Sequence, residues 1–424
     1  MKIQLFALLL LLAANSIASA LPPALQQIVD QALENSPEFA VEKLQHELSM
    51  LQLSINRREL LPGLSLSART GTNRSSEYIQ YSYSQSLSDS LSLQGSFQDY
   101  FTGTDSQGTL KLTSDLNTLF SDQLRKTYDL EREKRILSYK KTTESFKLEV
   151  IRSTYELVRQ QNILTVRKES LEHWKNTFEY YQARFKIGAI SKITMLNAEI
   201  NFLEQENLFN QQTKSLSNTI ESYKILIGFP LESTLEINSE ISGEHFDWTD
   251  IPLQKSFDVQ IREHELELIR IENRKKHLHR YGDFTFTSEY NRSSGEGAYS
   301  GTLGYTVDLG RNHPGLSDQA TDLQLSIARR SLERAGLESH RQRLAYIAEY
   351  DYLKRNLDLS EKKLKSATES YEYAQLAIQK GMISSLDLQD AQQKLTNAQQ
   401  DRLNANINFL LLKYEMIYAF GGEI

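Results

Sequence analysis

A few histidine pairs are the first residues in this chain whose types and spacing could do chemistry. His46-Glu47 and His264-Glu265 resemble the start of a zinc-protease motif, and His277-Leu278-His279 could be a pair of metal ligands. A zinc site of that class needs a second His four residues after the first, and neither His-Glu pair has one. No third ligand is evident. We therefore interpret these histidines as helix-surface residues and predict no metal site and no cofactor.

Other catalytic motifs are missing from the sequence. Gly295-x-Gly297 followed by Gly301 lacks the dinucleotide-binding spacing and lies between two expected strands, where a hairpin loop explains it. The chain has no cysteine, which excludes a thiol nucleophile and thiolate metal sites. No nucleotide-binding or Gly-x-Ser-x-Gly motif is present. The sequence predicts a protein that is not an enzyme and that takes no energy from a nucleotide of its own.

Composition excludes two further classes of protein. The 424 residues include 55 acidic and 48 basic side chains, a formal net charge of −7, which argues against nucleic acid as a partner. The mean hydropathy of −0.49 is too low for a bundle of membrane-spanning helices.

The N-terminal segment 1–20 has the features of a signal peptide. Lys2 is followed by an apolar run and then by Ala18-Ser19-Ala20, which suits cleavage before Leu21. The alternative, an N-terminal membrane anchor, is less favourable because the run is short for a bilayer about 30 Å thick. No later segment offers 18 consecutive apolar residues. If the mature protein enters a membrane, we expect it to do so as a β-barrel.

Two long stretches lack helix breakers. Gly188 is the only glycine between Lys111 and Ile227, and both 63–229 and 315–424 are free of proline. We predict a helix over about 121–187, roughly 100 Å long at 1.5 Å per residue. Two apolar series with heptad-like spacing favour coiled-coil packing over an ordinary bundle. They are Leu157, Leu164, Leu171, Phe178 and Phe185, and Tyr346, Tyr350, Leu353, Leu357, Ser360, Leu364, Ala367, Tyr371, Ala374 and Ile378.

The chain also repeats itself. Residues 39–48 match 257–266 at an offset of 218, and Gly188-Ala189-Ile190-Ser191 matches Gly381-Met382-Ile383-Ser384 at an offset of 193. Each unit is predicted as a short helix, a strand region, a very long helix, a turn and a returning helix. The first unit has these at 24–60, 62–120, 121–187 and 190–227, and the second at 255–280, 282–313, 315–380 and 384–420.

The lengths of these elements predict how each unit is arranged. The two shorter helices of the first unit, stacked end to end, would run alongside the long one. Because the two long helices are nearly equal in length, the difference between the two offsets must fall elsewhere. We expect the additional residues of the first unit in its strand region.

The strand regions alternate between apolar and small polar residues. Tyr299, Leu303 and Tyr305 alternate with Ser300, Thr302 and Thr306. Two isolated hairpins have no second sheet on which to bury an apolar face, so the pattern favours an outer-membrane barrel. One chain supplies too few strands for a wide barrel. We therefore expect an oligomer in which each subunit gives a few strands and two helical hairpins.

The chain resembles the TolC family of outer-membrane efflux proteins along essentially all of its mature length. The resemblance rests on Leu61-Pro62-Gly63, on Gly-x-Ile-Ser at both turns and on Ile227-Gly228-Phe229-Pro230, in this order. It implies a mainly α fold with a β-barrel portion, in which a homotrimer forms an outer-membrane barrel and a periplasmic α-helical barrel. It also implies an exit duct of a tripartite efflux or type I secretion system. The implied partners are a periplasmic adaptor, an inner-membrane transporter and outer-membrane lipid.

The resemblance also implies functional positions. Asp387 and Asp390 lie three residues apart on the helix after the second turn, where the family has its acidic aperture. The alternative interpretation is that they are exposed acids stabilised by the helix dipole. The turns at 188–191 and 381–384 are the expected adaptor-docking tips. The closing contacts of the family do not carry over, since Thr194, Ile378 and Ile383 depart from its pattern. An additional hairpin within 62–120, beyond the family's usual two strands, stays open.

The predicted organisation has four parts: a signal peptide (1–20), a first repeat (21–230), an equatorial linker (231–254) and a second repeat (255–424). We expect the protein in the cell outer membrane, extending into the periplasm. Two other functions fit part of the sequence. A trimeric coiled-coil adhesin would place its stalk in one block, and a periplasm-spanning structural tether would explain the coiled coils alone.

Overall fold

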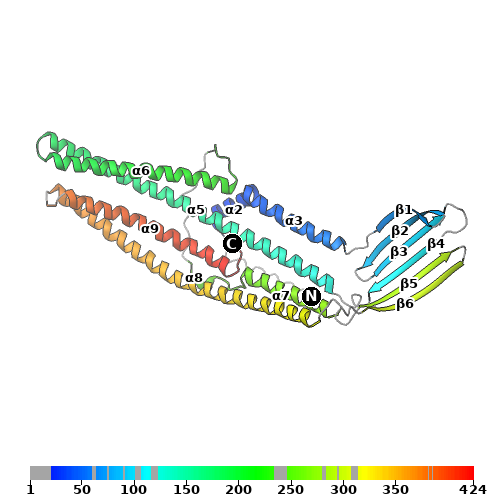
Figure 1. Cartoon of the computed structure of the whole chain (residues 1–424). Coiled ribbons are helices and arrows are strands. Elements are labelled where there is room, and N and C mark those ends of the chain that lie inside the picture. Colours follow the sequence, from blue (N-terminus) through cyan, green and yellow to red (C-terminus); the bar gives the residue numbers. More distant parts are fainter. Residues whose placement is uncertain are drawn as a thin grey trace, which may run out of the picture. The chain divides into compact units, whose positions relative to one another are not determined.

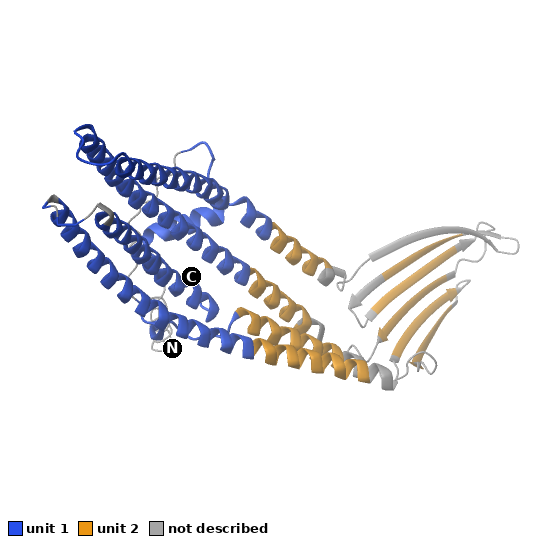
Figure 2. Cartoon of the chain, turned by 60° about the vertical axis from the view of Figure 1, so that its left-hand side comes forward, with its two compact units in different colours: residues 1–43, 140–256, 337–424 blue, residues 44–139, 257–336 orange. Residues whose placement is uncertain are grey.

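The computed structural model describes residues 21–59, 64–73, 76–88, 91–100, 107–115, 123–233, 246–278, 283–293, 296–306, 314–380, 382–383 and 385–424. The predicted signal peptide therefore lies outside the described residues. The helices and strands are labelled in Figure 1, and the two compact units that the chain forms are coloured separately in Figure 2. Unit 1 comprises residues 1–43, 140–256 and 337–424, and unit 2 comprises residues 44–139 and 257–336.

Both repeats follow the predicted order of elements. The first contains α2 (Pro23–Asn35), α3 (Pro37–Glu59), β1 (Leu64–Asn73), β2 (Ser76–Ser88), β3 (Leu91–Tyr100), β4 (Gln107–Asp115), α5 (Gln123–Lys186) and α6 (Lys192–Ile227). After a short 3-10 turn (Trp248–Asp250), the second contains α7 (Phe257–Leu278), β5 (Asp283–Ser293), β6 (Glu296–Thr306), α8 (Pro314–Gln379) and α9 (Ser385–Ala419). The two very long helices have 64 and 66 residues, as the missing breakers predict. Among the described residues, we find no helix whose length and hydropathy would let it cross a membrane.

The prediction of a single helix over 24–60 is wrong, because the helix is interrupted at Ser36, directly before Pro37. Proline disfavours helical backbone in the residue that precedes it, and Ser36 accordingly has an extended ψ of 125°. The hydroxyl of Ser36 then accepts a hydrogen bond of 3.4 Å from the backbone N–H of Phe39. Two helices, α2 and α3, therefore stand where one was expected.

The predicted heptad series differ in how well they describe the core of unit 1. On α8, Tyr350, Leu353, Leu357, Ser360 and Ala374 are buried, which confirms that series. On α5, Leu157 is buried but Phe185 is 37% exposed, and a second line of buried residues runs beside the predicted one. That second line consists of Val166, Ser170, Trp174 and Tyr181.

The physical reason is that α5 contacts more than one helix. Its Thr154 hydroxyl lies 2.9 Å from the hydroxyl of Tyr223 on α6, whereas the ring of the next residue, Tyr155, packs 6.4 Å from the ring of Tyr414 on α9. A single heptad line describes a helix with one neighbour, and α5 has two buried lines because it has several.

The six strands that the structure describes in unit 2 form one antiparallel sheet in the order β1-β2-β3-β4-β5-β6. The first repeat supplies four of them and the second supplies two, so the extra residues of the first repeat do form an additional hairpin. The pairing of β4 with β5 joins the two repeats, with Leu110 opposite Tyr290 and Thr113 opposite Thr287. The first strand region therefore contains four strands, two more than the usual two.

The register places the large apolar side chains on one face of the sheet. Tyr81 lies opposite Phe97, Leu110 opposite Tyr290, and Phe286 opposite Leu303, in pairs that share one parity across the sheet. The other face carries small polar residues, among them Ser82, Ser96, Thr109, Thr287 and Thr302. The alternation predicted for these strands is confirmed where their side chains are described.

Each returning helix ends against the backbone that precedes a short helix of its own repeat. Gly228 follows α6 with a φ of +69°, and a Cβ atom there would clash with the carbonyl of Asn35. Gly421 follows α9 with a φ of +79°, and a Cβ atom there would clash with the carbonyl of Lys255. The same contact thus occurs in both repeats, and it agrees with the end-to-end stacking that the helix lengths predict.

Candidate functional sites: the helical turns, the acidic pair and the contacts between repeats

The α5–α6 turn contains all four predicted residues of the first tip. Gly188 adopts a φ of +71°, a left-handed conformation that glycine tolerates best. The backbone N–H of Ala189 donates to the carbonyl of Arg184 at 2.9 Å, which closes the end of α5. Ser191 caps α6 by accepting a 3.2 Å hydrogen bond from the backbone N–H of Thr194. The twinned sequence motif is therefore a helix stop followed by a helix start.

The α8–α9 turn repeats part of this geometry. The backbone N–H of Met382 donates to the carbonyl of Ala377 at 2.9 Å, the same bond as in the first turn at the equivalent position of the second repeat. Ile383 is half-buried. Gly381 and Ser384, also predicted for this tip, lie outside the described residues. The two turns lie at the same end of unit 1 (Figure 1).

Apolar side chains are exposed at both turns. Ile187 and Ile193 flank the first turn with 78% and 72% of their surface exposed, and Met382 in the second turn is 67% exposed. Ala189 is also exposed, whereas Ile190 is half-buried. Exposed aliphatic side chains grouped at one end of a helical unit are typical of a surface that binds another protein.

Asp387 and Asp390 lie near the beginning of α9, and both are exposed. Between them, the amide oxygen of Gln389 accepts a hydrogen bond of 3.2 Å from Asn201 on α6. Directly after them, Ala391 and Gln392 are buried. The side of α9 that carries the two acids therefore differs from the sides that contact the rest of the protomer.

Polar contacts join the two repeats within unit 1, and no pattern in the sequence indicated them. The guanidinium of Arg152 on α5 donates twice to the carboxylate of Glu415 on α9, at 2.9 and 2.6 Å. Farther along the same helices, Arg159 donates to the amide oxygen of Asn408 at 2.7 Å. Polar residues on a helix do not show which neighbour they face, so periodicity could not pair them.

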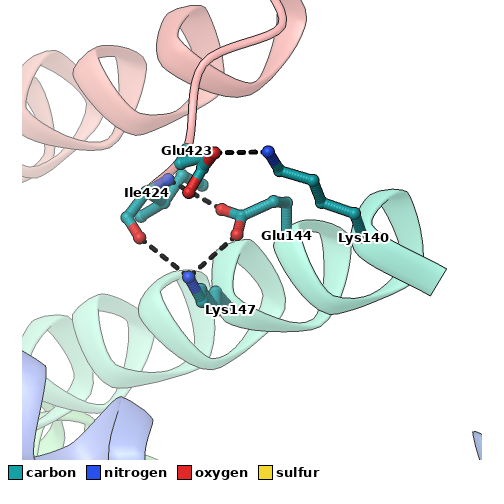
Figure 3. Close-up of polar contacts among 5 residues, drawn as sticks. All are labelled: Lys140, Glu144, Lys147, Glu423 and Ile424. Atoms are coloured by element: carbon teal, nitrogen blue, oxygen red, sulfur yellow. Dashed lines mark hydrogen bonds and ion pairs between the residues drawn. The ribbon is translucent and has the colours of Figure 1, made fainter. Parts of the chain in front are cut away.

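A cluster of charged residues holds residues 423 and 424 against α5 (Figure 3). The carboxylate of Glu144, only 3% exposed as a residue, accepts a 2.7 Å hydrogen bond from the backbone N–H of Ile424. The ammonium of Lys147 donates to the other oxygen of Glu144 at 2.8 Å and to the backbone oxygen of Ile424 at 3.0 Å. Lys140 pairs with Glu423 nearby. No local pattern in the sequence indicates this cluster, because Glu144 and Ile424 lie 280 residues apart.

A second kind of surface consists of apolar side chains on α8 that point away from the protomer. They are Leu337, Leu344, Tyr352, Leu359 and Tyr373, each at least half exposed. Successive members are seven or eight residues apart, except that Leu359 and Tyr373 are separated by two heptads, so the spacing is close to a heptad repeat. This exposed series lies beside the buried series of the same helix. A helix with two such lines is expected to have neighbours on both sides.

The comparisons with known proteins agree with this architecture. The family model described as outer membrane efflux protein matches residues 28–226 and 253–410. These two segments correspond to the two repeats, which neither an adhesin stalk nor a simple tether would explain. No curated protein sequence matches the chain.

Solved structures of outer membrane proteins have the same fold. The outer membrane protein VceC from Vibrio cholerae is 14% identical, with a TM-score of 0.75 over 94% of this chain and 96% of that chain. The MtrE outer membrane channel of Neisseria gonorrhoeae is 16% identical, with a TM-score of 0.70 over 94% and 89% of the two chains. The Campylobacter jejuni CmeC outer membrane channel is 18% identical, with a TM-score of 0.67 over 94% and 86%.

The family match covers well over half of the chain, and it agrees with the tandem repeat, the long helical hairpins and the sheet with one apolar face. The chain therefore belongs to the outer membrane efflux protein family, and it serves as an exit duct in the outer membrane.

Proposed function

We propose that three copies of this chain form the duct and that it passively conducts cargo from a periplasmic adaptor and an inner-membrane pump to the cell exterior. The observation that carries this proposal is the described sheet, in which β1 and β6 each pair with only one neighbouring strand. Open edges on a sheet with an exposed apolar face are costly in water and invite pairing with further strands. Pairing β6 of one copy with β1 of the next closes the sheet into a barrel and removes both edges.

The exposed apolar line on α8 supports the same assembly. Leu337 and Tyr373 are 66% and 65% exposed in the protomer, and burying such side chains stabilises by about 1.5 to 3 kcal/mol each. A second copy is the occupant that the repeat architecture favours, because closed rings of identical subunits bury the same surface in every copy. The helices of the three copies would then form the periplasmic tube.

The acids at 387 and 390 are proposed as the selectivity element of this tube. Threefold symmetry would place three copies of each residue around the axis, six carboxylates in all. Carboxylates in a confined mouth concentrate cations and repel anions. Support comes from their exposure in the protomer, on a helix whose other sides contact α6 and the buried core.

The two turns are proposed as the docking tips for the adaptor. Support comes from the exposed aliphatic side chains around Gly188 and at Met382, and from the fixed geometry of the first turn. Because Ala189 and Met382 are exposed, substitutions there should alter docking without disturbing the packing of the hairpins.

Purified protein in a planar bilayer tests the duct and its acids together. We expect cation-selective channels from a species that chemical crosslinking identifies as a trimer. Asp387→Asn with Asp390→Asn should weaken cation selectivity and leave the trimer intact. Asp358→Asn with Asp401→Asn removes two other exposed acids from α8 and α9 and should leave selectivity unchanged. Equal selectivity in the two double variants would refute the assignment of the acids, and the absence of channels would refute the duct.

Photo-crosslinking in whole cells tests the docking tips. A photoreactive amino acid at position 189 or 382 should form an adduct with a periplasmic protein anchored in the inner membrane, identified by mass spectrometry. The same group at position 253, where Leu253 is an exposed apolar residue outside both turns, is the control and should not. Adducts only at position 253, or none at either turn, would contradict the docking assignment.

A further inference from the structure

Among the described residues, the strand region of the first repeat contains one hairpin more than that of the second. The helical regions before the strands match at an offset of 218, and those after the strands match at an offset of 193, so the first strand region is longer by 25 residues. By the first offset β1 corresponds to β5, and by the second β4 corresponds to β6. The segment from Ser76 to Tyr100, which contains β2 and β3, is 25 residues long and has no counterpart in the second repeat.

An inserted hairpin leaves the direction of the chain unchanged. Adding two antiparallel strands returns the chain to the end of the sheet at which it began, so β4 still leads into α5 as β6 leads into α8. One additional strand would have reversed β4 and placed the following helix at the opposite end of the sheet. The repeat can therefore accept this insertion without any change to its helices.

The inserted hairpin is part of the sheet and does not project from it. β2 pairs with β1 over ten residue pairs, and β3 pairs with β4 over eight. Tyr81 and Phe97 of the hairpin lie on the same face as Leu110 and Tyr290. At Gly95 of β3, an added Cβ atom would lie 3.5 Å from the side chain of Leu110 on β4. Because glycine has no side chain, Leu110 packs over the backbone of β3 at this position.

We propose that the barrel of this duct has eighteen strands, six from each of three copies, instead of the twelve that two strands per repeat would give. This inference rests on the proposed trimer. Strands about 4.8 Å apart and tilted by about 40° give a backbone diameter of roughly 36 Å for eighteen strands and roughly 24 Å for twelve. The cross-section of the barrel is then about twice that of a twelve-strand barrel, so the barrel admits bulkier cargo. The helical end of the duct, and not the barrel, then limits which cargo passes.

The absence of cysteine from the chain allows a direct measurement of the barrel width. A spin label on Thr287→Cys lies on the polar face of β5, opposite Thr113 and Thr302. Three such labels form a triangle whose side is about 0.87 of the barrel diameter. The corresponding backbone distances are about 31 Å for eighteen strands and about 21 Å for twelve. Labels on the polar face lie inside the backbone circle and shorten both values by the same amount. Electron–electron double resonance on the detergent-solubilised full chain is therefore compared with both values after the inward reach of the labels is subtracted, and the two cases differ by about 10 Å.

Deletion of Ser76–Tyr100 is the matched control. It joins β1 to β4 through residues 74–75 and 101–106 and should shorten the distance to the twelve-strand value in a trimer that survives. The twelve-strand distance in the full chain, or no shortening in the deletion variant, overturns the eighteen-strand barrel while the trimer stands. If the deletion variant does not fold, the distance in the full chain alone decides. A full chain without any defined distance, and without a crosslinked trimer, overturns the proposed assembly itself.

Discussion

The carboxylate of Glu144 on α5 accepts a 2.7 Å hydrogen bond from the backbone N–H of Ile424, two residues that are 280 positions apart (Figure 3). Lys147 completes the arrangement by bonding to both residues. Through this contact, the chain beyond α9 is fixed to the long helix of the other repeat. A buried carboxylate with two polar partners is a point at which a single substitution should have a large effect.

Glu144→Ala should destabilise unit 1 by about 1 to 3 kcal/mol, because the ammonium of Lys147 loses its counter-ion and the N–H of Ile424 loses its acceptor. Glu423→Ala is the control. Its partner Lys140 has a side chain that is 41% exposed and its own is 65% exposed, so the loss should stay below about 1 kcal/mol. Chemical denaturation followed by circular dichroism measures both. Equal effects of the two substitutions would contradict the structural importance of Glu144.

Among the described residues, three glycines have a positive φ, and they should respond differently to alanine. Gly188→Ala meets no atom within 4 Å, so only the left-handed backbone is strained, at roughly 1 kcal/mol. Gly228→Ala and Gly421→Ala add a clash with the backbone at Asn35 and Lys255, and they should cost more. Thermal unfolding of the three variants should therefore separate Gly188→Ala from the other two. A similar loss in all three would mean that conformation alone, and not the close approach, explains these glycines.

Alkaline pH should destabilise the core of unit 1. Burial raises the pKa of Tyr223 to about 12, although its hydrogen bond with Thr154 acts in the opposite direction. A raised pKa in the folded state means that the stabilisation is complete below the unfolded value of about 10 and is lost as the pH rises through about 12. At pH 11 the linkage predicts a loss of about 1.4 kcal/mol from this residue.

Tyr223→Phe removes that ionisation and should reduce the loss of stability between pH 8 and pH 11. Near neutral pH the substitution should cost little, because Thr154 keeps its 2.8 Å hydrogen bond to the carbonyl of Val150. Burial also raises the pKa values of Tyr155 and Tyr414, so part of the alkaline effect will remain. Identical pH dependence in the variant and the parent would show that Tyr223 has the same pKa in the folded and the unfolded state.

Acid should weaken a contact within unit 2. Burial of Glu265 raises its pKa, but hydrogen bonds from Lys134 and Arg262 outweigh that effect and hold the pKa below its usual range. A lowered pKa in the folded state gives stability that is present above the unfolded value of about 4.3 and is lost as the pH falls through the folded value. Glu265→Gln should therefore make the stability of unit 2 less sensitive to pH below about 4.5.

Glu267→Gln is the matched control for this acid effect. Glu267 pairs with Arg270 inside α7, whereas Glu265 reaches Lys134 on α5 at 3.1 Å. Denaturation curves at pH 3.5 and pH 7 should differ less for Glu265→Gln than for Glu267→Gln. The reverse order would show that the contact between α7 and α5 contributes no pH-dependent stability.

The sequence by itself determined the repeat, the long helices and the alternation of the strands. These features depend on local rules: glycine and proline end helices, a period near 3.5 marks a coiled-coil face, and a period of two marks a half-buried strand. Phe39 matches its counterpart at an offset of 218, and Gly188 matches its counterpart at an offset of 193. This difference between the two offsets also placed the additional residues in the first strand region. Gly188 and Ser191 could be assigned to a turn because glycine commonly ends a helix and serine commonly caps the beginning of the next one.

Only the tertiary structure decided which residues meet across the repeats. The second buried line on α5, the pairing of Arg152 with Glu415 and the contact of Glu144 with Ile424 all depend on which helices are neighbours. Side-chain type and local spacing do not encode that, because a charged residue on a helix has the same local pattern whether it faces solvent or a partner in the other repeat. The strand count was undecided for a similar reason: alternation marks a strand, but only the register from β1 to β6 shows that all six belong to one sheet.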